Sequence, residues 1–190
     1  IDVIYFRTGK QRGGNSLPAR LPQNFNEFFY LAGLFIGDGS ERKFVVGKEE
    51  LAQSVEKIFK KLQIKHKRVY RSDRTPEIHT NLTFVYMLIS LFDYPLRQKS
   101  HNIRISEFLW QSSNENISKF LRGYFDADGY TAKDHRELEL ATASKLMSEQ
   151  LRLALLRFGI FGFSVKPKIV NGDLYYRCSI YNKSVNLFHQ

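Results

Sequence analysis

Two aspartates, Asp38 and Asp128, end two segments of matching sequence and are the residues of this chain best suited to chemistry. In LAGLFIGDG (residues 31–39) and LRGYFDADG (residues 121–129), the leucine, the first glycine, the last aspartate and the final glycine align. Each segment has the pattern of an apolar helix, and a carboxylate at the C-terminal end of a helix is disfavoured by the helix dipole. If the two helices pack side by side and parallel, the carboxylates also repel each other. Divalent cations between the two aspartates would remove both penalties.

The composition narrows what such a metal site would act on. Oxygen ligands without a His or Cys at the site favour a hard cation, Mg²⁺ or Mn²⁺. The chain has 29 Lys plus Arg against 19 Asp plus Glu, a formal net charge of +10, which favours a polyanionic partner. No apolar run is long enough to cross a bilayer and nothing resembles a signal peptide, so nucleic acid is favoured over a membrane. Paired carboxylates with divalent metal in a basic protein indicate hydrolysis of phosphodiester bonds.

Cysteine content bears on the compartment. The single cysteine, Cys178, excludes a disulfide within the chain and a cysteine-based zinc site. We therefore expect a reducing intracellular setting, cytoplasmic or nucleoid-associated.

Small residues in both segments predict how the two helices meet. Residues four apart lie on one stripe of a helix, and small side chains there let two backbones approach closely. Each glycine costs about 1 kcal/mol of helix propensity, which close packing would offset. The stripe consists of Gly33 and Gly37 in the first segment and of Gly123 and Ala127 in the second. We expect the two segments to pack on each other within a monomer, with Gly39 and Gly129 as left-handed helix caps.

The elements around the two segments predict an internal repeat. The pattern helix–strand–strand–helix–strand–strand–helix occurs twice, which gives an α+β chain of two pseudo-symmetric repeats. In the first repeat we expect a helix ending at Asp38, strands over 41–47, a helix over 48–64, strands over 65–71 and 77–81, and a helix over 82–92. In the second we expect helices over 114–130 and 144–160, strands over 163–170 and 174–182 with a turn at Asn171–Asp173, and a helix from residue 182. The predicted domains are an N-terminal basic arm or linker (1–24), the first repeat (25–100), a linker (101–113) and the second repeat (114–190), which we expect to continue past Gln190.

The two segments resemble the signature of the LAGLIDADG homing endonucleases, in the single-chain form with two copies that archaeal introns and inteins encode. The resemblance covers roughly residues 25–190 and implies αββαββα repeats, motif helices at the central interface, and antiparallel sheets forming a saddle over DNA. It implies that Asp38 and Asp128 hold Mg²⁺ or Mn²⁺ and act in catalysis, helped by the backbone carbonyls of Gly37 and Ala127. Asp126 matches the other aspartate of the signature, which is not a metal ligand in the family.

The supporting basic residue is where this sequence departs from the family. The linker resembles that of intein-type members, which carry a Lys two residues before Ile-Pro. In HNIRISEF, Ile103 stands at the position of that Lys and Ser106 at the position of the Pro. Lys99 and Arg104 are neighbouring candidates. Lys43 and Lys133, each five residues after its aspartate, are the matched pair that spacing favours as catalytic bases or cations, with Lys48 as a further candidate.

Basic residues on the predicted hairpins indicate where double-stranded DNA would bind. A two-stranded ribbon fits the major groove, where Lys and Arg can contact guanine and His can contact other base edges. For any single residue the alternative is a solvated basic surface. The DNA-binding candidates are Lys67, Arg68, Arg71, Arg74 and His79 in the first repeat, and Lys166, Lys168 and Arg177 in the second.

Three functions fit these observations. The first is a metal-dependent, site-specific DNA endonuclease with a long asymmetric target. The second is a maturase that binds intron RNA, and the third is a DNA-binding protein of the same fold without cleavage. Retention of both Asp38 and Asp128 argues against the third. The chain has no N-terminal Cys or Ser and no C-terminal His-Asn, so for an intein parent we expect it to be the endonuclease portion.

Overall fold

The computed structural model describes residues 3–7, 16–20, 25–40, 42–71, 74–95, 99–132, 136–181 and 183–188. The first repeat contains α1 (Phe25–Asp38), β3 (Gly39–Ser40), β4 (Lys43–Val45), α2 (Glu49–Lys61), β5 (His66–Arg71), β6 (Arg74–Thr80) and α3 (Leu82–Leu91). The second contains α6 (Asn114–Asp128), β7 (Gly129–Thr131), β8 (Glu137–Thr142), α7 (Lys145–Leu156), β9 (Phe163–Val170), β10 (Asp173–Tyr181) and α8 (Lys183–Phe188). Helices α4 (Lys99–Asn102) and α5 (Glu107–Trp110) lie between the repeats, and β1 (Val3–Arg7) pairs with β2 (Ser16–Arg20) ahead of them.

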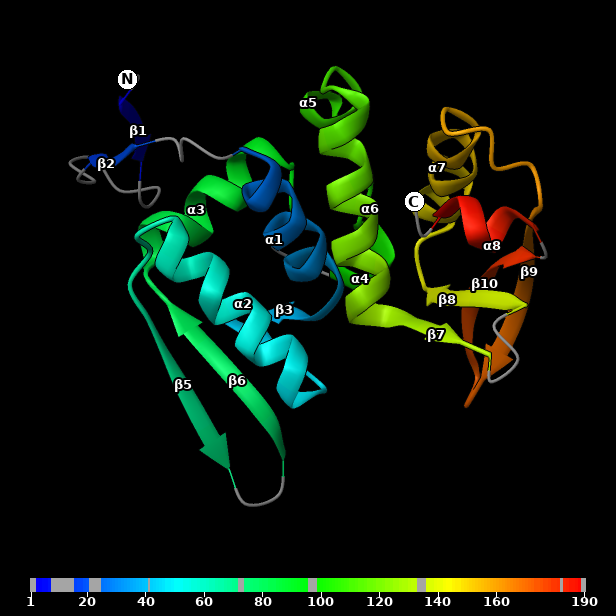
Figure 1. The fold of residues 1–190 in the computed structure, drawn as a ribbon, viewed down its shortest axis with the longest axis horizontal. Helices are drawn as coiled ribbons and strands as arrows, with labels where there is room; N and C mark the ends of the chain where they lie inside the picture. Colours follow the sequence, from blue (N-terminus) through cyan, green and yellow to red (C-terminus); the bar gives the residue numbers. More distant parts are fainter. Residues whose placement is uncertain are drawn as a thin grey trace.

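The predicted α+β class with two αββαββα repeats is confirmed. Each repeat forms a four-stranded antiparallel sheet, in the orders β3-β4-β6-β5 and β7-β8-β10-β9. Figure 1 shows α1 and α6 side by side in the centre, with one sheet to either side and the β5–β6 hairpin projecting from the body.

Local sequence explains where the elements begin and turn. Asn81, Ser113 and Ser144 each accept a hydrogen bond from the backbone N–H three residues later, at the start of α3, α6 and α7. Asn171 and Gly172 have φ of 51° and 89°, which a two-residue hairpin turn requires. The turn predicted between the last two strands is therefore confirmed.

The stripe of small residues is the contact line between α1 and α6. A Cβ added to Gly33 would overlap the carbonyl oxygen of Phe120, and one added to Gly123 would overlap the carbonyl oxygen of Tyr30. The two backbones thus touch at matched points, as predicted. The packing continues at Gly37, where a Cβ would lie 2.6 Å from the Cβ of Ala127.

Gly39 and Gly129 are not left-handed caps, so this expectation was wrong. Gly129 has φ −85° and ψ 151°, and both glycines lead directly from helix into strand. Glycine is needed there for space, because a Cβ on Gly39 or Gly129 would overlap the carbonyl oxygen of Phe35 or Phe125 respectively.

Each sheet has one face covered by helices and one face left open. In the first sheet Phe44 and Ile78 are buried, and the Phe44 ring packs 5.4 Å from that of Phe59 on α2. In the second sheet Leu140 and Cys178 are buried on the corresponding side. Because side chains alternate along a strand, the residues between these lie on the open faces.

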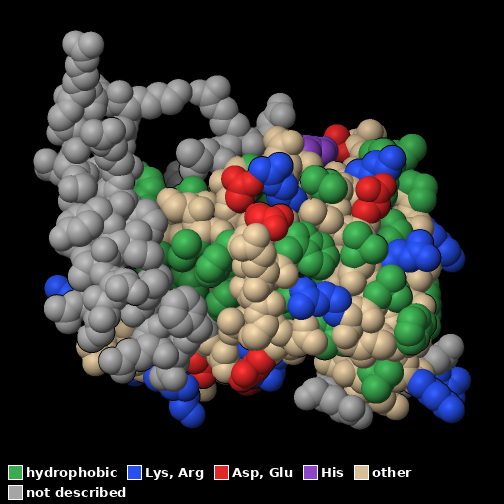
Figure 2. All heavy atoms as spheres, turned by 90° about the horizontal axis from the view of Figure 1, so that it is seen from above, with side chains coloured by type: hydrophobic (Ala, Val, Ile, Leu, Met, Phe, Trp, Pro, Cys, Tyr) green, Lys and Arg blue, Asp and Glu red, His purple; other side chains and the backbone are tan. Residues whose placement is uncertain are grey.

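No helix in the described part of the chain is long and apolar enough to cross a membrane. Viewed from above, the described surface carries acidic, basic and hydrophobic side chains intermixed (Figure 2). In the described part of this side, basic side chains are therefore not gathered into one patch.

Candidate active site

The two aspartates meet where α1 and α6 end together. Asp38 and Asp128 are the last residues of their helices, and the seam between the helices runs up to them. A Cβ on Gly37 would lie 3.2 Å from Oδ2 of Asp128, so Asp128 faces the backbone that carries Asp38. The predicted convergence of the two motif ends is thus present in the fold.

A lysine from the connection between the repeats completes this centre. Lys99 Nζ donates hydrogen bonds to the carbonyl oxygens of Gly37 (2.7 Å) and Gly39 (2.6 Å), on either side of Asp38. Tyr94 supports it, because its hydroxyl donates to the Gly39 carbonyl at 3.0 Å and its ring centroid lies 5.3 Å from the ammonium. One cation therefore lies beside both carboxylates.

The pKa values reflect this crowding. The pKa of Asp128 is raised to about 6, mainly by burial and then by the negative charge of Asp38, while Lys99 opposes both. Asp128 keeps an exposed surface, yet the protein around its carboxylate still desolvates it. Burial also raises the pKa of Asp38 against the influence of Lys99. Burial lowers the pKa of Lys99 to about 8 although both aspartates favour its charged form.

The donor set fits a hard divalent cation. Within the described ranges no three His, Cys, Asp or Glu side chains gather in a metal-binding group, so this centre offers two carboxylates and backbone carbonyls. Mg²⁺ is typically held by one or two carboxylates, with water and substrate phosphates completing its shell. Burial and the charge of Asp38 both favour the protonated form of Asp128, so a cation between the two carboxylates would favour their ionised forms. The Gly37 carbonyl accepts a hydrogen bond from Lys99. Lys99 and a bound metal ion would therefore have to share this oxygen.

We expect the stabilisation by Mg²⁺ to grow with pH. The pKa of Asp128 in the folded state, about 6, exceeds its unfolded value of about 3.9, so folding loses stability as pH rises through that window. Above it the ionised pair should bind the cation, and below it protons compete. Thermal melting with and without Mg²⁺, from about pH 8 to about pH 5, should show an increment that shrinks on acidification. Asp128→Asn is the control, and an increment independent of pH in the unmodified chain would contradict this assignment.

Of the two predicted catalytic lysines that the structure describes, Lys43 and Lys99, only Lys99 is found at the aspartates. Lys43 lies on β4, where its Nζ is 2.8 Å from Oε1 of the buried Glu77. Lys133 lies outside the described residues. Ile103 is buried and Ser106 caps α5 by accepting from the N–H of Leu109, so these two linker residues serve packing.

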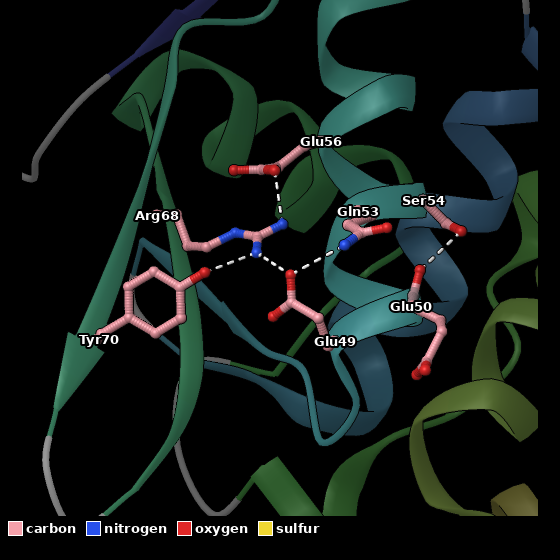
Figure 3. A network of polar contacts seen from close by, with 7 residues as sticks. All are labelled: Glu49, Glu50, Gln53, Ser54, Glu56, Arg68 and Tyr70. Atoms are coloured by element: carbon pink, nitrogen blue, oxygen red, sulfur yellow. Dashed lines mark hydrogen bonds and ion pairs between the residues drawn. The ribbon is translucent and has the colours of Figure 1, made fainter.

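The predicted DNA-binding residues of the first repeat divide between the two faces of the sheet. His79 pairs in register with both Lys43 and Lys67, which puts these three side chains in one row on the open face. Arg68 lies on the other face. It contacts Glu49 and Glu56 of α2 at 2.5 and 2.6 Å and donates to the Tyr70 hydroxyl at 2.7 Å (Figure 3). Arg71 and Arg74 pair at the tip of the hairpin, and their side chains are outside the described part.

The predicted residues of the second repeat all lie on its open face. Lys166 pairs in register with Arg177, and Lys168 with Tyr175. A shallow cavity of about 300 Å³ extends along this face from Asp128 to Lys168 and Arg177. The open face of the second sheet is therefore continuous with the aspartate centre.

Sequence reasoning missed three residues of this region. Tyr94 holds the Gly39 carbonyl beside Lys99, Glu77 lies under Lys43 and His79, and Glu139 contacts Arg177. Their only signal was position: a tyrosine just before the linker lysine, and acids at alternating strand positions beside basic residues.

Comparison with known proteins agrees with this architecture. Residues 115–188 match the model of the LAGLIDADG-like domain. The crystal structure of I-DmoI in complex with DNA and Mn superposes with a TM-score of 0.65 at 15% identity, covering 87% of this chain and 95% of that one. The N-terminal LAGLIDADG domain of DUF199/WhiA superposes with a TM-score of 0.61 at 15% identity, covering 90% and 83%. At these identities the likeness establishes the fold.

Curated relatives are similar over most of this chain but are much longer. A probable translation initiation factor IF-2 of Thermococcus kodakarensis is 38% identical over 159 residues, 81% of this chain and 14% of that protein. A replication factor C small subunit of the same organism is 32% identical over 193 residues, 94% of this chain and 21% of that protein. An elongation factor 2 of Methanopyrus kandleri is 34% identical over 146 residues, 77% of this chain and 12% of that protein.

Proposed function

We propose that this chain, a two-repeat protein of LAGLIDADG fold whose residues 115–188 are a LAGLIDADG-like domain, is a site-specific double-strand DNA endonuclease. The observation that carries the proposal is the meeting of Asp38 and Asp128 at the end of the α1–α6 seam, with Lys99 beside them. A protein that only bound DNA would have no use for two carboxylates that raise each other's electrostatic cost next to a polyanion.

Within this proposal Asp38 and Asp128 would hold Mg²⁺ or Mn²⁺, which would supply an activated water and stabilise the charge that develops on the phosphate. Asp38 and Asp128 come from two different helices, so one centre would be available to both DNA strands. Lys99 lies within hydrogen-bonding distance of the Gly37 and Gly39 carbonyls. Burial lowers its pKa to about 8, but this value still leaves it mostly charged near neutral pH. It can therefore favour the ionised aspartates and attract a scissile phosphate. Both aspartates belong to one chain, which supports a monomer as the active form.

The relatives support the origin of this chain as a segment that is inserted into unrelated proteins. An initiation factor, an elongation factor and a replication factor subunit have different names, yet each shares a segment of similar length with this chain. A segment that makes up 12% to 21% of such different proteins is best explained as an insertion within them. We infer that this chain is the endonuclease portion of an intein-like element, and that its substrate is host DNA inside the cell. The target would be the uninterrupted host gene.

Binding should be steeply salt-dependent and specific for duplex DNA. Each phosphate neutralised adds about −0.9 to the slope of log affinity against log salt, so about six contacts give a slope near −5. Binding of a labelled duplex spanning the uninterrupted host gene should be measured in Ca²⁺ over a salt series. A single-stranded RNA of the same sequence is the competitor. Tighter binding of the RNA, or a slope near zero, would favour the maturase alternative.

Cleavage tests the proposal directly. A plasmid carrying the uninterrupted gene should be linearised in Mg²⁺ and remain intact in chelator. Specific binding without any cut in Mg²⁺ or Mn²⁺ would leave only a DNA-binding protein of this fold.

A further inference from the structure

The pairing of the strands shows which residues of the two repeats are equivalent. These equivalences differ from those that equal spacing along the sequence suggests. Gly39 pairs with Phe44 in the first sheet, and Gly129 pairs with Leu140 in the second. Phe44 and Leu140 are therefore equivalent, and both are buried. One residue back along the same strands, Lys43 is equivalent to Glu139.

The neighbouring strands extend this match. Val45 pairs with Glu77, and Ala141, the residue equivalent to Val45, pairs with Arg177. Glu77 and Arg177 are therefore equivalent as well. Both repeats thus place an ion pair at the same two positions of the sheet, but with the charges exchanged.

The two ion pairs are built differently. In the first repeat the carboxylate is the buried member. Glu77 is 3% exposed and contacts Lys43 at 2.8 Å and His79 at 2.9 Å. In the second repeat the cation is the exposed member. Arg177, 44% exposed, contacts Glu139, which is 21% exposed, and lies 3.8 Å from Glu137.

Both networks lie on the open sheet faces, next to the aspartate centre. Lys43 pairs in register with Ser40, two residues after Asp38, and Glu139 pairs with Tyr130, two residues after Asp128. The two rows are therefore equivalent in their distance along the chain from the catalytic carboxylates.

We propose that this exchanged ion pair gives the two half-sites opposite hydrogen-bonding polarity at matched positions, so that the DNA target cannot be palindromic there. The inference rests on the proposed function. In the first half the row formed by Lys43, His79 and Lys67 presents hydrogen-bond donors, which suit the O6 and N7 acceptors of guanine. In the second half the same row presents the Glu139 carboxylate, which suits the amino group of cytosine.

One row closer to the aspartates, where the register brings Val45 and Ala141 level with Asp38 and Asp128, the preference reverses. There the second half presents Arg177 and Lys166, which suit guanine, while the first half presents Val45 and Val69, which suit the methyl group of thymine. Glu77, in that row, is covered and acts as a positioning residue for Lys43 and His79.

The test is selection of bound duplexes from a random-sequence DNA pool in Ca²⁺, followed by sequencing. The main variant is the double exchange Glu139→Lys with Arg177→Glu, which keeps the ion pair and involves two partly exposed side chains. The reciprocal variant is Lys43→Glu with Glu77→Lys. The matched control is Lys145→Glu with Glu149→Lys, an exposed pair on α7. Thermal melting of each variant verifies folding.

The unmodified chain should select a site that is asymmetric at the matched positions. The main variant should change the preferred base in one half-site only, by about tenfold or more, as expected for one specific base contact. The control should leave the selected site unchanged. A selected site that is palindromic at these positions, or one unaltered by the main variant, would overturn the inference and leave the endonuclease proposal intact. Failure of the unmodified chain to enrich any duplex would overturn both.

Discussion

Asp38→Asn and Asp128→Asn should each strongly slow cleavage while leaving DNA binding intact. Asparagine keeps the shape and one carbonyl oxygen but removes the charge that holds the cation. We expect the cleavage rate to fall by roughly 10²–10³-fold, equivalent to several kcal/mol of lost charge stabilisation. Affinity for the duplex should stay the same or rise slightly, because one negative charge near the phosphates has gone.

Asp126→Asn is the matched control for these two variants. Asp126 lies in the same turn of α6 but accepts a hydrogen bond from the Tyr30 hydroxyl at 2.8 Å, and it lies 3.8 Å from Arg122. Its loss should change cleavage little. Plasmid cleavage and duplex binding should be measured in parallel for all three variants. An Asp38→Asn protein that cuts both strands at the normal rate, or full activity in chelator, would exclude the metal-dependent mechanism.

Gly33→Ala and Gly123→Ala should destabilise the chain although alanine favours helices by about 1 kcal/mol over glycine. The new methyl group would overlap a carbonyl oxygen of the facing helix, and a backbone cannot move aside as a side chain can. We expect a net loss of about 1–3 kcal/mol, and a larger loss for Gly33→Leu. For a chain of this size that lowers the melting temperature by about 2–4 °C per kcal/mol.

Gly47→Ala is the control, because a Cβ there would meet no atom within 4 Å. Thermal melting of the three alanine variants separates seam contact from the general effect of replacing glycine. Equal melting temperatures for Gly33→Ala and Gly47→Ala would contradict close packing of α1 on α6.

The sequence was sufficient to predict the repeat, the seam and the meeting of the two motif ends, because each depends on local patterns that occur twice. Arg68 illustrates what it could not predict. Only the burial of Phe44 and Ile78 fixes which side of the first sheet faces α2, and with it the direction of Arg68. A run of basic residues does not show which side chains point to which face of the strand, because a shift of one residue exchanges the two faces.

Equal spacing from the aspartates also suggested the wrong equivalence between residues of the two repeats. Lys43 and Lys133 each follow their aspartate by five residues, but β8 begins only at Glu137. The chain from β7 to β8 is longer than that from β3 to β4, which shifts the register and makes Glu139 the counterpart of Lys43. Tyr94 was missed because it becomes part of the centre only through the fold of the connection after α3.

The connection between the repeats has a consequence for building chimeric enzymes from halves of related proteins. Its first part belongs to the aspartate centre through Lys99, whereas its second part is anchored on the other repeat. There Ser144 Oγ donates to the Ile103 carbonyl at 2.7 Å, and the Ile105 N–H donates to Gln150 at 2.7 Å. A crossover placed between residues 102 and 103 would keep both sets of native contacts within their own parents. A crossover a few residues earlier would graft a foreign lysine, or none, onto the aspartates.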